Sequence, residues 1–156
     1  MNPDYFINLA IAQAKHVPAY PFGAVIVRRD DNAIMATGFN QGVINPSWHG
    51  EMVAINNCAQ QHPKADWQHF DLYTTAEPCP MCQSAILWAG IGRVYYGTSI
   101  AYLQSHGWQQ IDIRAEEVIA RSPFRQCLLV GGILETQCNA LFENAKLQAS
   151  NGRYFS

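Results

Sequence analysis

Two short stretches of this chain contain the residues with the clearest chemical potential. They are His49-Gly50-Glu51 and Pro78-Cys79-Pro80-Met81-Cys82, with residues 52–77 between them. One imidazole and two thiolates can occupy three of the four tetrahedral positions around a zinc ion. A structural zinc is normally closed by a fourth protein ligand, so three ligands indicate a catalytic site with an open position. The sequence therefore predicts a hydrolytic zinc centre bound by His49, Cys79 and Cys82.

The chemistry needs a group that transfers protons beside the metal, and Glu51 is the candidate. Zinc lowers the pKa of a bound water from about 15.7 toward about 7. Loss of an amino group from an amidine-like carbon then needs a proton on a ring nitrogen and a second one on the departing amine. A single carboxylate that acts first as base and then as acid covers both transfers.

Local sequence predicts how these side chains are presented. Pro80 suits the first position of a helix, which places Cys79 at the N-cap and Cys82 in the first turn. Unpaired amides at that end favour the thiolate form that binds metal. Residues two apart on a helix point away from each other, so His49 is expected at or just before a helix start, with Pro46 limiting the helix upstream.

Two other interpretations of these motifs were weighed. Cys-x-x-Cys is common in thioredoxin-like redox proteins, but that interpretation leaves the preceding His-x-Glu unexplained. A closed structural zinc site would need a fourth ligand, for which Cys58, His62 and His69 are candidates without a paired motif spacing. The catalytic metal site is favoured, because it accounts for His49, Glu51 and both cysteines together.

Hydrophobic patterning predicts an alternation of helices and strands around the motifs. Strands are expected at 24–27, 34–40, 71–75, 93–97 and 127–130, the first two forming a hairpin. Helices are expected from Pro3, over 51–60 with Met52, Ile55 and Ala59 facing inward, over 81–89 and over 135–149, with short helices in 101–121. This order predicts a three-layer α/β/α sandwich with a five-stranded mixed sheet, and residues 1–156 are expected to form a single domain.

Composition limits which classes of binding partner and which cellular compartment are expected. Charged residues make up 14% of the chain and the net charge is −2, whereas proteins that bind nucleic acid through its phosphates usually show a basic footprint. A nucleic-acid partner is thus disfavoured, and the low charge favours an oligomer. Neither a signal peptide nor a membrane-spanning run is visible, and three further cysteines lie in apolar segments, so a cytoplasmic protein is expected.

The motif H-x-E…P-C-x-x-C is the signature of zinc deaminases that act on nucleobases. The chain resembles the cytidine and deoxycytidylate deaminase superfamily, especially the branch of guanine, cytosine and tRNA adenosine deaminases. Matching segments include 21–27, 38–40, 77–82 and 91–97, so the resemblance covers nearly the whole chain. It implies the cytidine deaminase fold, Zn²⁺ as cofactor and a homodimer. It also implies zinc binding by the three ligands above, catalysis by Glu51, and a base held by Asn40 and the backbone at Ala24.

The resemblance implies a nucleobase or nucleoside as substrate, and guanine, converted to xanthine, is the first choice. The acidic net charge and Pro80 favour guanine. The segment Gly131–Glu135 followed by Cys138, however, resembles the last strand and helix of the tRNA enzymes. Alternatives are tRNA adenosine deaminase and a catalytically silent fold that binds nucleic acid or another partner. Trp108, or Tyr154-Phe155, is a candidate to cap the base as a lid. The alternative is that Trp108 is a packed indole and that the terminal residues are a frayed tail.

Overall fold

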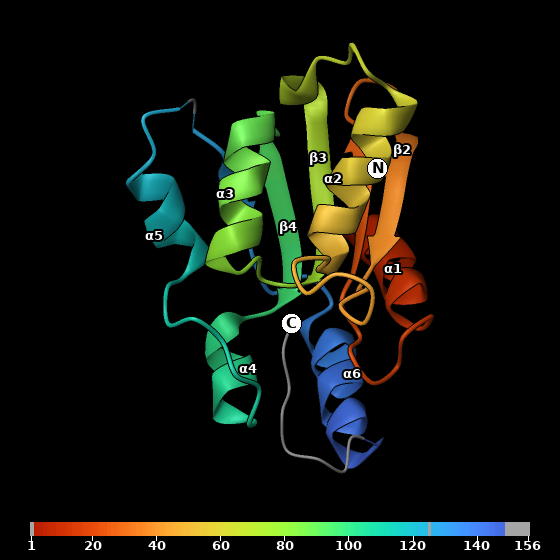
Figure 1. Cartoon of the computed structure of the whole chain (residues 1–156), viewed down its shortest axis with the longest axis vertical. Helices are drawn as coiled ribbons and strands as arrows, with labels where there is room; N and C mark the ends of the chain where they lie inside the picture. The colour runs from red at the N-terminus through yellow and green to blue at the C-terminus, as the bar shows by residue number, and fades with distance from the viewer. Residues whose placement is uncertain (1, 125, 149–156) are drawn as a thin grey trace.

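A mixed five-stranded sheet forms the centre of the molecule, with strand order β2-β1-β3-β4-β5. The computed structural model describes residues 2–124 and 126–148. Strand β1 is antiparallel to β2 and to β3, whereas β3, β4 and β5 run parallel (Figure 1). The predicted five-stranded mixed sheet is confirmed.

In chain order the elements are α1 (Pro3–Ala14), β1 (Gly23–Arg28), β2 (Ala33–Phe39), α2 (Gly50–Gln61), a 3₁₀ turn (Trp67–His69), β3 (Phe70–Ala76), α3 (Pro80–Ala89), β4 (Arg93–Thr98), α4 (Ile100–Ser105), α5 (Ala115–Ala120), β5 (Leu128–Val130) and α6 (Glu135–Gln148).

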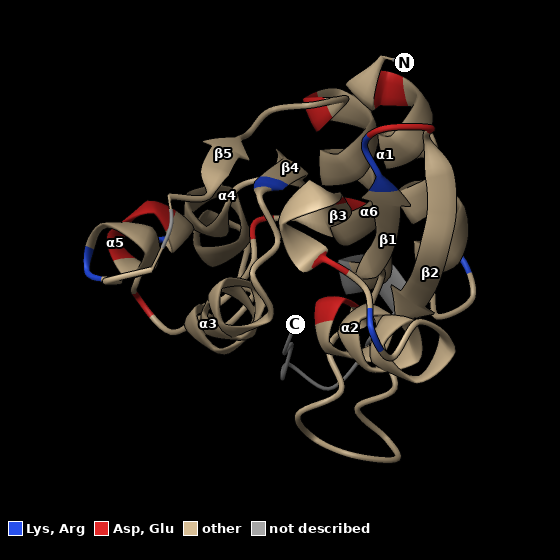
Figure 2. Ribbon diagram, turned by 90° about the horizontal axis from the view of Figure 1, so that it is seen from above, with Lys and Arg blue, Asp and Glu red and all other residues tan. Residues whose placement is uncertain are grey.

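Alternate side chains of the strands point to opposite faces of the sheet, and each face is covered by helices. Ala24, Ile26 and Leu72 belong to a buried cluster that also contains residues of α2 and α3. Val25 and Tyr73, from the same strands, pack with α1 and with Cys138 of α6 on the other face. Figure 2 shows these two helix layers on either side of the sheet, as expected for a three-layer α/β/α sandwich.

The first helix and the hairpin form where local sequence favours them. The side chain of Asn2 caps α1 by accepting a hydrogen bond of 2.8 Å from the amide of Asp4, and Pro3 occupies the first helical position. In the β1–β2 turn, Asn32 adopts a left-handed φ of 59°, which Asn tolerates better than most residues. These local signals were correctly interpreted from the sequence.

The predicted inward face of α2 is only partly correct, because Ile55 packs against the core cluster but Ala59 does not. Met52 and Ile55 are only half-buried and Ala59 is exposed, whereas the buried residues include Gly50, Glu51, Val53, Ala54 and Cys58. The reason lies at the helix start, where Gly50 packs so closely against β1 that a Cβ there would lie 2.6 Å from the carbonyl oxygen of Phe22. This contact fixes the rotation of α2 and turns Glu51 into the protein.

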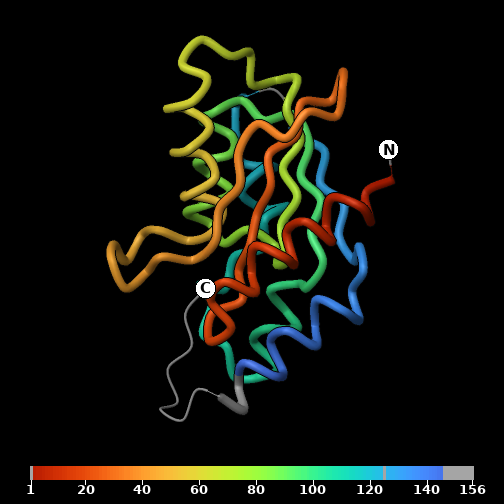
Figure 3. Tube along the Cα trace, turned by 90° about the vertical axis from the view of Figure 1, so that its right-hand side faces the viewer, coloured from red at the N-terminus to blue at the C-terminus, as the bar shows by residue number. Residues whose placement is uncertain are grey.

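The loop between β2 and α2 extends from the body of the molecule (Figure 3) and exposes Val43 and Ile44. Lysine, arginine and acidic residues are spread over several elements (Figure 2). Within the described part of the chain, no helix is long and apolar enough to cross a membrane.

Candidate active site

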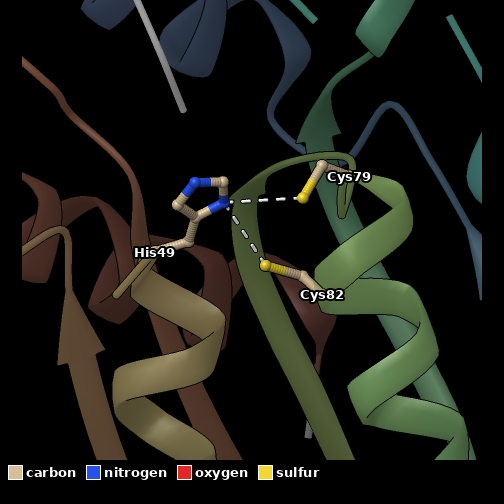
Figure 4. Close-up of side chains that lie close together, drawn as sticks. All are labelled: His49, Cys79 and Cys82. Carbon is tan, nitrogen blue, oxygen red and sulfur yellow. Dashed lines mark hydrogen bonds between the residues drawn. The ribbon is translucent and has the colours of Figure 1, made fainter. Parts of the chain in front are cut away.

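His49, Cys79 and Cys82 meet where α2 and α3 begin. The Nδ1 atom of His49 lies 3.4 Å from Sγ of Cys79 and 3.5 Å from Sγ of Cys82, and it is directed toward both sulfur atoms (Figure 4). Tetrahedral zinc with ordinary Zn–N and Zn–S bonds holds such ligand atoms about 3.6 Å apart. The three side chains therefore fit a zinc ion, and no other cluster of three or more His, Cys, Asp or Glu residues with metal-binding geometry occurs in the described part of the chain.

The two helix starts present the three ligands. His49 is the N-cap of α2 with an extended ψ of 161°, and Cys79 is the N-cap of α3 with a ψ of 168°. Pro80 occupies the first helical position and Cys82 the first turn of α3. The predicted local conformations are confirmed, including the non-helical backbone at His49. Because the N-cap residue is outside the helical spiral, His49 and Glu51 can both face the site.

Glu51 is almost completely shielded from solvent, with 3% of its surface exposed. Its Oε1 accepts a hydrogen bond of 3.0 Å from the hydroxyl of Thr74 on β3. Burial raises the pKa of Glu51, and the nearby charge of Cys79 raises it further. A carboxylate with a raised pKa can both accept and return a proton near neutral pH, which suits general acid–base catalysis.

The two thiols have different electrostatic environments. The pKa of Cys79 is lowered to about 4, mainly by a hydrogen bond from Cys82 and also by the hydrogen bond and charge of His49, against the effect of burial. Burial raises the pKa of Cys82 well above its usual value. Cys79 therefore supplies a thiolate to a cation, and coordination itself deprotonates a thiol such as Cys82.

A cavity of about 450 Å³ opens beside the metal ligands. His49 and Cys79 line its inner side, and Pro46 and Met81 flank them. The outer wall consists of Gln109–Ile111, from the loop between α4 and α5. Sequence reasoning missed this wall, because no periodicity or motif marks it and its proximity to Cys79 arises only from folding.

Asn40 and Ala24, the residues expected to hold the base, lie close to the metal motif but do not line this cavity. Asn40 is buried at the end of β2, where its Oδ1 accepts a hydrogen bond of 2.9 Å from the amide of Gly42. Ala24 lies in β1 directly opposite Thr74, the residue that contacts Glu51.

Trp108 lies in the core and not in the cavity. Only 2% of its surface is exposed, it packs edge-on against Phe22 and Phe142, and its indole Nε1 donates a hydrogen bond of 3.3 Å to the carbonyl of Phe142. The structure thus places Trp108 as a packed indole, and it does not form a lid. Tyr154 and Phe155, the other expected lid, lie outside the described residues.

The candidate fourth ligands for a closed zinc site lie elsewhere. Cys58 is buried in the core between α2 and the sheet. His62 Nε2 lies 3.1 Å from the carbonyl oxygen of Met35, and His69 pairs with Asp66. None of the three belongs to the described metal cluster. The open position that the spacing predicts is therefore retained, as a catalytic zinc requires.

The sequence and the fold match known deaminases. Residues 1–98 match the family model "Cytidine and deoxycytidylate deaminase zinc-binding region". The guanine deaminase of Bacillus subtilis is 35% identical over 158 residues, 94% of this chain and 99% of that protein. The tRNA-specific adenosine deaminase of Buchnera aphidicola is 32% identical over 148 residues, 92% of this chain and 87% of that protein. A structure solved in complex with 8-azaguanine is 22% identical and superposes with a TM-score of 0.84, covering 95% of this chain and 86% of that chain.

The metal triad, the buried carboxylate and these relatives define a zinc-dependent aminohydrolase. The chain belongs to the cytidine and deoxycytidylate deaminase family, and it is a nucleobase or nucleoside deaminase. The expected cofactor, zinc, is confirmed by the family match and by the ligand geometry.

Proposed function

We propose that this chain deaminates guanine to xanthine with release of ammonia. The observation that carries the choice of substrate is the guanine deaminase of Bacillus subtilis, which the chain matches over 99% of that protein's length. The acidic net charge of −2 supports a small molecule over RNA. Pro80, which fits the first position of α3, is a further point of resemblance to guanine deaminases.

Residues of this chain account for the proton transfers in the proposed reaction. Zinc bound by His49, Cys79 and Cys82 would supply Lewis acidity that makes water nucleophilic at neutral pH. The carboxylate of Glu51 takes the proton of the attacking water and passes it to a ring nitrogen. It then takes the proton of the newly added hydroxyl group and gives it to the amine, which leaves as ammonia while the carbonyl forms. Thr74 holds that carboxylate in place. We also propose that Asn40 and the backbone at Ala24 hold the base.

The tRNA adenosine deaminase activity is the second candidate, because the relative from Buchnera aphidicola matches 92% of this chain. A catalytically silent binding fold is the third. The buried position of Glu51 argues against it, because a metal site without catalysis does not need a desolvated carboxylate beside the ligands.

A screen of ammonia release separates the three candidates. The zinc-loaded protein is given guanine, guanosine, cytosine, cytidine, adenine and a tRNA anticodon stem-loop. Turnover of guanine is expected, with little activity on the other substrates. Activity confined to the stem-loop would support tRNA editing, and binding of RNA with steep salt dependence but no ammonia would support the silent fold.

The assembly, domain and location are also proposals. We propose a homodimer, because the chain has little charge and exposes Trp88 of α3, at 77%, packed edge-on against Phe124. Analytical ultracentrifugation of the zinc-loaded protein tests the homodimer, and Trp88→Ala is expected to weaken association.

We propose that residues 1–156 form a single deaminase domain, because α1 and α6 cover the same face of one sheet. The five buried free cysteines support a cytoplasmic location.

A further inference from the structure

Glu77 is a buried carboxylate with an unusually complete set of hydrogen-bond donors. Its side chain is 1% exposed. The Nε of Arg114 donates to both carboxylate oxygens, at 2.9 and 3.0 Å. The amide of Ile100 donates to Oε1 at 3.0 Å, and the amide of Ala115 donates to Oε2 at 2.8 Å. These hydrogen bonds offset the large free-energy cost of burying a charged carboxylate. They also hold the donor residues next to Glu77.

The contacts of Glu77 connect the metal ligands to the outer wall of the cavity. Glu77 precedes Cys79 by two residues, and its own amide donates to the carbonyl of Thr98 at 2.7 Å. Its partners Ile100 and Ala115 are the first helical residues of α4 and α5. The cavity wall Gln109–Ile111 lies on the segment between these two helices. One carboxylate thus holds both ends of the segment that faces the metal site.

Two described backbone contacts constrain the wall itself: a β-bridge at Gln109, and a hydrogen bond of 2.8 Å from the amide of Ile113 to the carbonyl of Ile111. Gln109 and Ile111 are exposed, and the packed indole of Trp108 anchors the segment on its N-terminal side. On the other side, Arg114 and Ala115 bind Glu77, and Asp112 accepts a hydrogen bond of 3.0 Å from the side chain of Gln104. Gln110 has an amide nitrogen that is shielded from solvent and has no hydrogen-bond partner among the described residues. Movement of the wall would therefore change the polar contacts available to a bound base.

We propose that Glu77 is a positioning residue that holds the wall Gln109–Ile111 against the metal site and thereby sets the affinity of the pocket for its base. It acts through the wall and takes no part in the proton transfers. The inference rests on the proposed function for its kinetic consequence. Its structural consequence, the order of the wall, is independent of which substrate is used.

The test compares two buried carboxylates, one within β3 and one directly after it. Glu77→Gln removes the charge and one acceptor at the metal end of β3. Asp71→Asn removes a matched charge near the opposite end, where Asp71 accepts hydrogen bonds of 3.1 and 2.7 Å from Arg29. In Glu77→Gln we expect KM to rise about tenfold, kcat to change less than about threefold, and one zinc per chain to be retained. In Asp71→Asn stability falls but KM stays unchanged.

Hydrogen exchange provides a readout that does not need activity. In Glu77→Gln the amides of Ile100 and Ala115 and those of segment 109–113 should exchange at least about tenfold faster than in the wild type. In Asp71→Asn their rates should not change. If Glu77→Gln does not fold, Arg114→Gln breaks the same link from its half-exposed side and should give the same pattern. Arg114→Lys, which keeps the charge, should restore part of the affinity.

Several results would overturn the positioning role. Equal KM changes in Glu77→Gln and Asp71→Asn would show that Glu77 only contributes to the overall stability of the fold. Loss of zinc in Glu77→Gln would show that Glu77 supports the metal ligands and not the wall. Unchanged exchange in segment 109–113 would also refute the proposal. If the wild type releases no ammonia from any substrate, the proposed function fails, and the exchange experiment still decides the role of Glu77.

Discussion

The hydroxyl of Thr74 on β3 donates a hydrogen bond of 3.0 Å to the carboxylate of Glu51 on α2. Both residues are buried, and the same hydroxyl lies 3.1 Å from the carbonyl of Ala76. The contact joins the strand that leads to Cys79 with the helix that begins after His49. It therefore orients the proton-transferring carboxylate relative to ligands from two different parts of the chain.

Replacement of the carboxylate should separate catalysis from metal binding. In Glu51→Ala we expect one zinc per chain, as in the wild type, and a fall in kcat of about 10²- to 10⁴-fold, because the ligands remain and the proton carrier is lost. Zinc content by atomic absorption and ammonia release provide the measurements. Glu117→Ala, on the exposed side of α5, is the control and should keep full activity. Unchanged turnover in Glu51→Ala would refute the proposed mechanism.

Removal of the Thr74 hydroxyl should weaken catalysis less than loss of Glu51. Thr74→Val keeps the shape of the side chain but leaves the buried carboxylate without this donor, at a cost of about 1–3 kcal/mol in the free energy of unfolding. We expect kcat to fall by about tenfold, because Glu51 is less well oriented. Thr75→Val is the matched control, because the Thr75 hydroxyl bonds Pro21 and Gly23 and does not contact Glu51. If both variants lose the same activity, the orienting role is excluded.

Loss of one thiol should remove the metal and with it part of the stability. Cys82→Ala leaves two ligands, so zinc should be lost on dialysis and the melting temperature should no longer rise when zinc is added. Cys58→Ala provides the control, because Cys58 of α2 is buried in the hydrophobic core and is not in the metal cluster. It should be destabilised by packing alone and should still bind zinc. Retention of zinc by Cys82→Ala would contradict the assigned ligand set.

The metal site could be predicted because its parts are encoded locally. Pro80 after Cys79 and Pro46 before His49 are signals that act within a few residues, and the structure confirms the conformations they predict. Because imidazole and thiolate groups are typical zinc ligands, both motifs can be assigned to one metal site before the fold is known. The five strands and both helix layers likewise follow from the alternation of helices and strands, whereas the strand order comes from the structure.

The wall of the cavity could not be predicted, because it depends on contacts between distant residues. Arg114 binds Glu77 across 37 positions of sequence, and nothing in the local pattern of either residue indicates the other. The rotation of α2 was missed for a similar reason. Apolar periodicity favoured Met52, Ile55 and Ala59, but close packing at Gly50 determines the face that is buried.

That close packing leads to the last prediction, for Gly50→Ala. The added methyl would lie 2.6 Å from the carbonyl oxygen of Phe22, a backbone atom that cannot move aside alone, so the start of α2 must shift away from β1. We expect the free energy of unfolding to fall by about 1–3 kcal/mol despite the better helix propensity of Ala. Because His49 and Glu51 flank this position, kcat should fall as well. Asn56→Ala, on the exposed side of α2, raises helix propensity without this contact and should be fully active. A Gly50→Ala protein as stable and active as the wild type would show that the helix start tolerates the shift, and that the tight contact does not set the geometry of the site.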